Sequence, residues 1–190
     1  MNRYSIGVFI SGRGSNLKSI INASKDKNYP GEIKFVFSDN PSAKGLELAK
    51  KNNIECFSLD YNNYENKIIF ENEILALIKP YKLELICLAG YMRILSKNFI
   101  DTYPDKILNI HPSLLPKYKG LHTHRRAIEN KEYFSGCTVH YVNQNLDDGK
   151  IILQREVKIE HDETEKTLAD KVLEAEHIIY PEAIKIALMK

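Results

Sequence analysis

The sequence contains only three cysteines, Cys56, Cys87 and Cys137, each set inside an apolar or β-branched stretch. An odd number of widely separated cysteines predicts reduced, buried thiols rather than a disulfide framework. The sequence also lacks a CxxC pair and any closely spaced set of cysteine and histidine ligands, which argues against a structural zinc site. We therefore expect no metal in the chemistry of this protein.

Neither sign of charge is in marked excess. Lys and Arg number 27 and Asp and Glu number 25, which leaves a formal net charge of +2 at pH 7. This balance is too even to give the broad electropositive surface that binding to nucleic acid requires. Small molecules are therefore the expected partners.

Long hydrophobic runs are also absent. The apolar segment SIGVFI at 5–10 is far too short to span a membrane, and it lacks the small-residue cleavage site of a signal peptide. There is no internal repeat, low-complexity tract or linker-like stretch. With 43% hydrophobic residues, a chain of 190 residues is long enough to bury one sizeable core. These features predict a single cytoplasmic domain over residues 1–190 with no membrane partner.

Apolar runs and amphipathic segments alternate along the first part of the chain. SIGVFI ends at the turn signal SGRGSN, after which Leu17, Ile20 and Ile21 recur at helical spacing. The same succession of strand and helix returns twice, at 32–53 and 54–81. Three strand-to-helix units in a row predict a parallel sheet with helices on its faces.

Four further strands are expected downstream. LELICLAGY at 83–91 is apolar almost throughout, as a central strand covered on both sides would be, and KILNI at 106–110 is the next strand. The segments 133–143 and 150–159 alternate in polarity, which predicts paired strands near a sheet edge. The fold class is thus α/β, with a single doubly wound, mostly parallel sheet and a late antiparallel strand pair.

Helices are expected between and after these strands. Short helices are predicted near 96–104 and 123–131, and the end of the chain predicts a long helix. Thr164 and Thr167 are candidate caps for the long helix, and Pro181 predicts a kink or break within it.

The loop SGRGSN at 11–16 has the composition of a phosphate-binding turn. It follows a strand and opens a helix, so its backbone N–H groups, together with Ser15 and Asn16, can surround a phosphate at the positive helix end. Leu17 stands where the third glycine of a dinucleotide fingerprint would fall, and the P-loop lysine is absent. A mononucleotide or sugar phosphate fits better. The alternative is a tight turn in which Ser15 or Asn16 serves only as a helix cap.

The stretch NIHPSLLPKY at 109–118 places polar groups at the end of a predicted strand. Asn109 and His111 are two residues apart, so their side chains point to the same face and toward the ligand crevice beyond the strand. A protonated His111 and the Asn109 amide could stabilise an oxyanion during acyl transfer. Pro112 and Pro116 stiffen the loop that holds these donors. In the alternative reading His111 only satisfies backbone groups of the loop.

LDDG at 146–149 supplies carboxylates that could orient His111 and favour its protonated form, although DDG is also an ordinary turn. The segment KYKGLHTHRR at 117–126 is basic, and Arg125 and Arg126 near a helix start point either to a bound anion or to a solvated surface. A structural reading also exists for His122, His124, His140 and His177.

Five segments, in this order, resemble phosphoribosylglycinamide formyltransferases: SGRGSNL, LAGYMRIL, NIHPSLLPKYKGLHTH, HYVNQNLDDG and EAEHIIYP. The resemblance covers essentially the whole chain. HPSLLP alone would indicate only the wider formyltransferase superfamily, and the GSN loop after the first strand narrows the choice. The resemblance implies transfer of a formyl group from the co-substrate 10-formyltetrahydrofolate to the amine of glycinamide ribonucleotide, a step of de novo purine synthesis, without an acyl-enzyme.

The catalytic residues of that family fall on Asn109, His111 and Asp147. The resemblance implies that Asn109 and protonated His111 stabilise the oxyanion, while Asp147 supports His111 and helps an ordered water pass a proton toward the folate N10. Asp148 stands where a glycine is common, which leaves open which carboxylate acts.

The resemblance also implies the binding residues. About 1–100 would form the phosphate and ribonucleotide side, and 101–190 the catalytic loop and folate side. Substrate contacts fall on Gly14, Ser15, Asn16 and Glu176. Folate contacts fall on Lys67, Met92, Arg93, Ile94, Leu95, Asn109, Asn143 and Asp147. Lys67 replaces an arginine of some relatives and would lack its bidentate fork. The Leu115–Pro116 bond is expected to be cis, and the protein to be a monomer or homodimer.

Four other readings remain. Formyltetrahydrofolate deformylase uses the same three residues to give the formyl group to water, but usually carries an additional N-terminal domain. Methionyl-tRNA formyltransferase would need a C-terminal tRNA-binding domain, and a sugar-amine formyltransferase would explain the GSN loop less well. The fourth reading is an inactive module that binds folate or nucleotide. The presence of all three catalytic residues argues against this reading.

Overall fold

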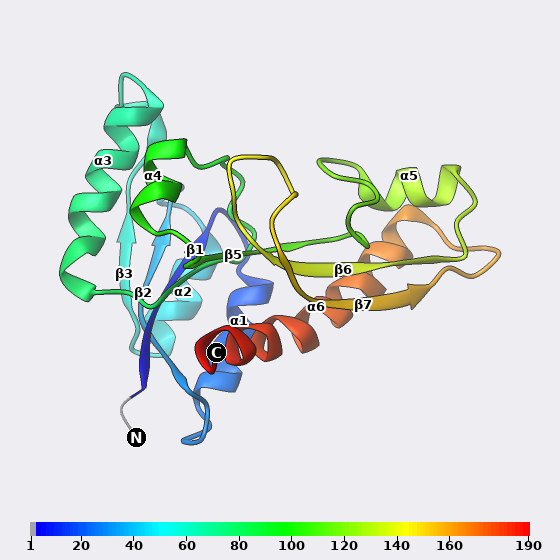
Figure 1. The fold of residues 1–190 in the computed structure, drawn as a ribbon, viewed down its shortest axis with the longest axis horizontal. Coiled ribbons are helices and arrows are strands. Elements are labelled where there is room, and N and C mark those ends of the chain that lie inside the picture. Colours follow the sequence, from blue (N-terminus) through cyan, green and yellow to red (C-terminus); the bar gives the residue numbers. More distant parts are fainter. Residues whose placement is uncertain (1–2) are drawn as a thin grey trace.

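The strands predicted from the sequence all pair within one sheet (Figure 1). In the computed structural model, which describes residues 3–190, the strands are β1 (Tyr4–Ile10), β2 (Gly31–Ser38), β3 (Glu55–Ser58), β4 (Leu85–Leu88), β5 (Ile107–His111), β6 (Phe134–Tyr141) and β7 (Ile151–Lys158). Their order across the sheet is β3-β2-β1-β4-β5-β6-β7. The first five strands are parallel, whereas β6 runs antiparallel to β5 and β7 antiparallel to β6. The predicted fold class is confirmed.

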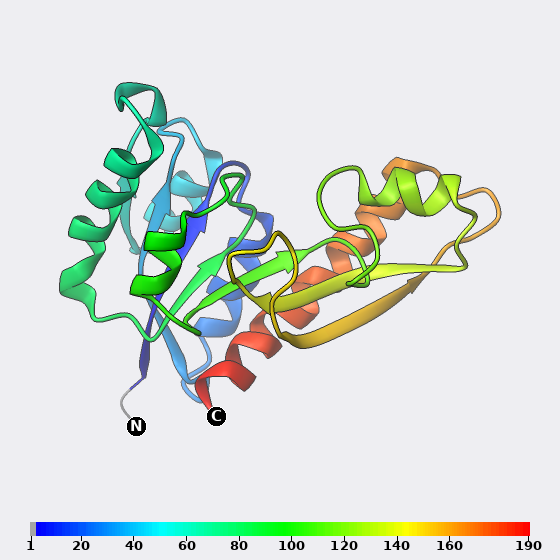
Figure 2. The ribbon, with the colours of Figure 1, turned by 45° about the horizontal axis from the view of Figure 1, so that its top comes forward.

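The helices cover both faces of this sheet. They are α1 (Ser15–Ser24), α2 (Lys44–Lys51), α3 (Lys67–Ile78), α4 (Lys97–Thr102), α5 (Thr123–Glu129) and α6 (Glu165–Leu188), with 3-10 helices η1 (Tyr61–Asn63) and η2 (Lys79–Tyr81). One core lies between the sheet and α1, α2 and α6, and the other lies beneath α3 and α4. Figure 2 shows α6 running along β6 and β7 toward α1. The periodic residues Leu17, Ile20 and Ile21 are buried as predicted.

Side-chain caps explain where several helices begin. Asn66 accepts a hydrogen bond from the Ile69 N–H at the start of α3, and Ser96 does the same for Phe99 at α4. Thr164 and Thr167 form a reciprocal capping box at α6, so the predicted caps are confirmed. The predicted break at Pro181 is wrong, because α6 continues through it to Leu188. Tertiary packing on the sheet outweighs the backbone hydrogen bond that proline removes.

The strand order reverses between β1 and β4, and this switch point positions the site. In open parallel sheets ligands collect beyond the carboxyl ends of the strands at such a point. The loops after β1 and β4 meet there, since the Ser11 N–H donates to the Gly90 carbonyl oxygen (3.1 Å) and the Met92 N–H to Ser11 Oγ (2.9 Å). The loop after β5 is the next neighbour across the sheet.

No helix within residues 3–190 is long and apolar enough to cross a membrane. The three cysteines are free thiols, and Cys87 and Cys137 are buried as predicted, whereas Cys56 is only partly buried. Burial raises the pKa of the Cys137 thiol to about 12 and that of Cys87 still further, so neither thiol is an activated nucleophile.

Candidate functional site

The loop 11–16, here named the phosphate loop after its predicted ligand, owes its shape to one glycine. Gly14 precedes α1 with φ of 76°, and a Cβ there would lie 2.8 Å from the Gly45 Cα, so only glycine fits both the conformation and the space. The cap carries no side-chain hydrogen bond, so neither Ser15 nor Asn16 serves as an ordinary N-cap. The first N–H groups of α1 are thereby left available for an anion.

Asn16 connects the phosphate loop to α6. Its side chain is buried, and Nδ2 donates to Glu176 Oε2 over 2.6 Å. Burial raises the pKa of Glu176 to about 7, and the hydrogen bond from Asn16 only partly opposes this rise. The two residues lie 160 positions apart in the chain. The structure therefore brings together two of the substrate-binding residues expected from the resemblance.

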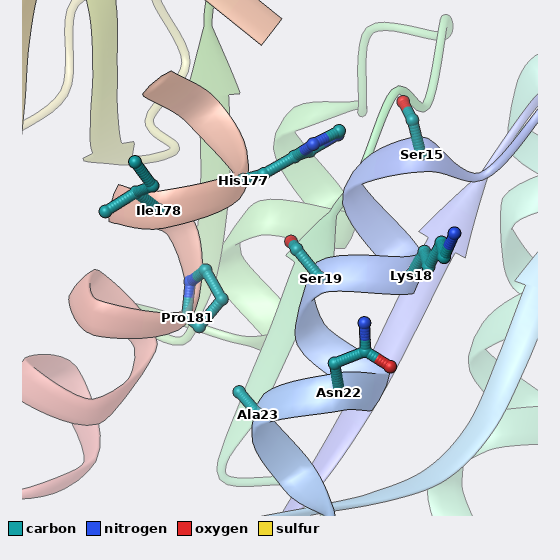
Figure 3. Close-up of a pocket in the computed structure, with 8 residues that line it drawn as sticks. All are labelled: Ser15, Lys18, Ser19, Asn22, Ala23, His177, Ile178 and Pro181. Carbon is teal, nitrogen blue, oxygen red and sulfur yellow. The ribbon is translucent and has the colours of Figure 1, made fainter. Parts of the chain in front are cut away.

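A groove of about 490 Å³ opens beside this contact between α1 and α6 (Figure 3). Ser15 and Lys18 line it from α1, and His177 reaches across from α6. Burial, together with the nearby Lys18 ammonium, lowers the pKa of His177. The groove thus presents hydroxyl and nitrogen groups next to the phosphate loop, and sequence reasoning had given no ligand role to Lys18 or His177.

The predicted catalytic residues converge at the end of β5. His111 is buried, and its Nδ1 lies 3.3 Å from Asp147 Oδ2 while its Nε2 lies 2.9 Å from the Tyr118 carbonyl oxygen. Both ring nitrogens therefore face oxygen acceptors, an arrangement that a doubly protonated imidazolium satisfies at both nitrogens. The Gly120 N–H also donates to Asp147 Oδ2 (2.9 Å), which ties the carboxylate to the loop after β5.

His140 completes this cluster from the neighbouring strand. It pairs with Asn109 across β5 and β6, and its Nδ1 lies 2.8 Å from the Tyr141 carbonyl oxygen. Because a carbonyl oxygen only accepts, Nδ1 carries the proton, and burial lowers the pKa of His140 so that the neutral ring prevails. Its Nε2 is then an acceptor for Asn109 Nδ2 at 3.3 Å. The contact fixes the orientation of the Asn109 side-chain amide, with Nδ2 toward His140.

The loop after β5 is rigid for a definable reason. Ser113 Oγ donates to the Lys117 carbonyl (2.6 Å), and the Thr138 hydroxyl donates to the Ser113 carbonyl (2.6 Å). Thr138 also accepts from the Leu115 N–H (3.1 Å). The Leu115–Pro116 peptide bond is cis, as expected from the resemblance. The three hydrogen bonds made by Ser113 and Thr138 hold the backbone of this loop in place.

The two neighbouring aspartates have different surroundings. Asp147 is buried against His111, whereas Asp148 is exposed and pairs with the Lys119 ammonium, which lowers the pKa of Asp148. Asp147 adopts φ of 49°, which an aspartate tolerates better than most residues. Of the two carboxylates, only Asp147 therefore contacts His111.

The expected folate residues lie in different parts of the structure. Lys67, Met92, Arg93 and Ile94 line a cavity of about 300 Å³ together with Tyr61, Phe70, Glu71 and Tyr91. Leu95 instead packs into the core beneath α3 and α4. Asn109 and Asp147 belong to the catalytic cluster, and Asn143 lies exposed in the same β6–β7 loop as Asp147, where its Nδ2 donates to the Asp148 carbonyl (3.3 Å).

Sequence reasoning missed several residues of the site. His140 had been given only a structural reading, although its position opposite Asn109 would follow from the register of the predicted strands.

Arg125 needs no bound anion, because it donates to Glu129 over 2.7 Å, and Arg126 donates to the Lys119 carbonyl over 2.7 Å. Within residues 3–190 no group of three or more acidic, histidine or cysteine side chains is arranged to hold a metal ion.

The loop 11–16 and the cluster of Asn109, His111 and Asp147 both lie beyond the carboxyl ends of strands in a doubly wound sheet, where enzymes of this fold class bind their ligands. The sequence profile of the formyl transferase family matches residues 4–184, and the chain belongs to this family.

The similarity extends to particular members. The chain is 42% identical over 177 residues to phosphoribosylglycinamide formyltransferase of Escherichia coli (strain K12), covering 93% of this chain and 84% of that protein. It is 38% identical over 181 residues to the human trifunctional purine biosynthetic protein adenosine-3, covering 95% of this chain but only 18% of that protein. The crystal structure of phosphoribosylglycinamide formyltransferase from Brucella melitensis superposes with a TM-score of 0.96 at 43% identity, covering 100% of this chain and 97% of that one.

Proposed function

We propose that this protein transfers the formyl group of 10-formyltetrahydrofolate to the amine of glycinamide ribonucleotide, as a phosphoribosylglycinamide formyltransferase of purine biosynthesis. The observation that carries the proposal is the contact of His111 with Asp147 beside Asn109, at the same sheet edge as an open phosphate loop. Relatives of this name share the architecture and about two fifths of the residues.

The ribonucleotide would bind along the loop after β1. Its phosphate accepts from the free N–H groups at the start of α1 and from Ser15, where the helix dipole favours negative charge. Glu176 and Asn16 lie at the adjacent wall and bind the ribose or glycinamide end. The groove lined by Lys18 and His177 continues from this position.

The reaction proceeds by direct attack of the substrate amine on the formyl carbon. Negative charge develops on the formyl oxygen, which Asn109 and protonated His111 stabilise. His140 directs one N–H of the Asn109 amide to itself and leaves the other for the oxyanion. The Nε2–H of His111, which lies 2.9 Å from the Tyr118 carbonyl oxygen, is the second donor to the formyl oxygen.

Asp147 has two roles in this scheme. Its carboxylate faces His111 Nδ1 and stabilises the imidazolium. It also helps an ordered water to carry the proton from the attacking amine to the folate N10, which leaves as tetrahydrofolate. The chemistry requires positioning and electrostatic stabilisation, for which a stiff, hydrogen-bonded loop is suited.

The test is formyl release from 10-formyltetrahydrofolate, followed spectroscopically with and without glycinamide ribonucleotide. Release that requires the ribonucleotide, with a formylated product by mass, is the expected result. Release to water in its absence would identify a deformylase. No release in either tube would favour a binding module.

Two substitutions test the catalytic assignment. His111→Ala and Asp147→Asn should each lower kcat by about 10² to 10³-fold, because each removes a group that acts mainly in the transition state. His161→Ala and Asp148→Asn are matched controls at exposed positions and should retain kcat within about twofold. Steady-state kinetics and thermal melting are measured together. A loss of folded protein that accounts for the loss of rate would make these residues structural instead.

A further inference from the structure

The loop 91–96 after β4 combines rigidity with exposed apolar side chains. Met92 is 74% exposed and Ile94 is 64% exposed, although they flank the cavity described above. Their backbone is nevertheless held at both ends: the Met92 N–H donates to Ser11 Oγ, and the Ser96 N–H donates to Glu71 Oε1 (2.9 Å). Exposing apolar side chains to water on a fixed backbone costs free energy, and a ligand-binding surface would account for their exposure.

Arg93 lies between these two apolar residues, and its partly buried side chain contacts other elements of the protein. Its Nε lies 2.6 Å from Asp39 Oδ2 at the end of β2, and its guanidinium stacks 3.7 Å from the centroid of the Tyr61 ring on η1. Phe70 on α3 adds a second ring at 5.9 Å. The middle of the loop is therefore attached to two further elements.

The ion pair with Arg93 also stabilises the buried Asp39 carboxylate. The Asp39 side chain is 7% exposed, and its second oxygen, Oδ1, is buried without a hydrogen-bond partner within residues 3–190. A buried carboxylate with one unsatisfied oxygen is stable only while a cation pairs with the other. The ion pair and the stacked ring together keep Arg93 in one orientation.

We propose that Asp39 and Tyr61 are positioning residues for the folate co-substrate. Through Arg93 they preorganise the 91–95 loop, so that its backbone and the Met92 and Ile94 side chains form a ready surface for the flat ring system. A loop ordered before binding spares the co-substrate the entropy cost of ordering it. The same lock commits Arg93 to internal contacts, so that the other cation lining this cavity is Lys67, whose Nζ lies 3.9 Å from Glu71 Oε1. This inference rests on the proposed function.

The test compares Tyr61→Ala with Tyr61→Phe, which keeps the stacked ring, and adds Asp39→Asn. Tyr61→Ala and Asp39→Asn should raise the KM for 10-formyltetrahydrofolate about 5- to 10-fold, whereas kcat and the KM for glycinamide ribonucleotide change less than about twofold. Tyr61→Phe should restore the KM to within about twofold. An unchanged folate KM in Tyr61→Ala, or an equal rise for both substrates, would overturn the proposal.

Hydrogen exchange of the ligand-free protein gives a readout that does not require catalysis. In Tyr61→Ala the amides of residues 91–96 should exchange at least about tenfold faster, while those of β1 and β5 keep the wild-type rate. Unchanged exchange at 91–96 would disprove the lock even if the enzyme is active. Faster exchange at 91–96 in Tyr61→Ala, combined with a wild-type protein that transfers no formyl group, would refute the proposed function and leave the lock intact.

Discussion

Glu176 is a buried carboxyl group whose ionisation the fold opposes. Its ordinary pKa is 4.5, and burial raises it to about 7 in the folded protein. Between these two values the folded protein retains a proton that the unfolded chain releases, so the free energy of unfolding falls as pH rises through this window. A shift of this size corresponds to roughly 3 kcal/mol between pH 5 and pH 8.

Glu176→Gln should remove this pH-dependent term while keeping an oxygen that accepts from Asn16. The stability of the variant relative to wild type should therefore increase by roughly 3 kcal/mol from pH 5 to pH 8, since other titrating groups cancel in the difference. Urea unfolding at both pH values measures it. Glu182→Gln, an exposed position on the same helix, is the control and should show no such change. A pH-independent difference for Glu176→Gln would mean that the carboxyl group is solvated.

At the residue scale, the sequence predicted which residues form the site better than it predicted which residues they contact. The spacing of Asn109 and His111 predicted two side chains on one face of a strand, and both contact groups of one cluster. The choice of Asp147 over Asp148 could not be made from the residues alone, because burial distinguishes the two carboxylates and depends on how the 143–150 loop folds back. His140 required knowledge of the strand register.

At the scale of the element, the loop–helix junction at Gly14 yields a sharp prediction. Gly14→Ala places a Cβ 2.8 Å from the Gly45 backbone in a left-handed conformation, so the free energy of unfolding should fall by about 2 kcal/mol. The start of α1 should shift with it and raise the KM for the ribonucleotide by about tenfold or more. Chemical denaturation and steady-state kinetics measure these effects.

Gly12→Ala is the matched control for stability. A Cβ at Gly12 meets no atom within 4 Å, so the substitution should change the free energy of unfolding by less than about 0.5 kcal/mol. Equal destabilisation by both substitutions would show that the cost does not come from the close approach of Gly14 to Gly45 and that the shape of the loop does not depend on Gly14 in particular.

Elements were predicted best where one physical cause acts alone. The apolar runs predicted the first five strands, alternating polarity predicted β6 and β7, and the threonine cap predicted the start of α6. Pro181 misled because two effects compete there: proline disfavours a helix interior, yet the residues on both sides of it, including Tyr180 and Ile184, are buried against the sheet. A sequence reveals the first effect directly and the second only once the sheet is assembled.

At the scale of the whole molecule, the site depends on strands that are joined side by side. The loops after β1, β4 and β5 carry the residues that we propose to bind phosphate, bind folate and act in catalysis, and the reversal of strand order brings the first two loops together. The helix α6 adds Glu176 from the other end of the chain. The order of the strands was not predictable from local patterns, because it is set by which buried surfaces match. Because Glu176 reaches the site from α6, this helix must be held against the central strands.

Tyr180 provides that connection, and it can be tested. Its ring is fully buried, and its hydroxyl shares one proton between the carbonyl oxygens of Leu88 on β4 (2.9 Å) and Leu108 on β5 (3.2 Å). Tyr180→Phe should lower the free energy of unfolding by about 1 to 2 kcal/mol, because two buried acceptors lose a donor. Tyr133→Phe, at a position that is 82% exposed, should leave it unchanged. Because the hydroxyl joins strands beneath the site and touches no proposed substrate contact, kcat should stay within about twofold in both variants. A large loss of kcat in Tyr180→Phe without loss of stability would place this hydroxyl in the chemistry rather than in the framework.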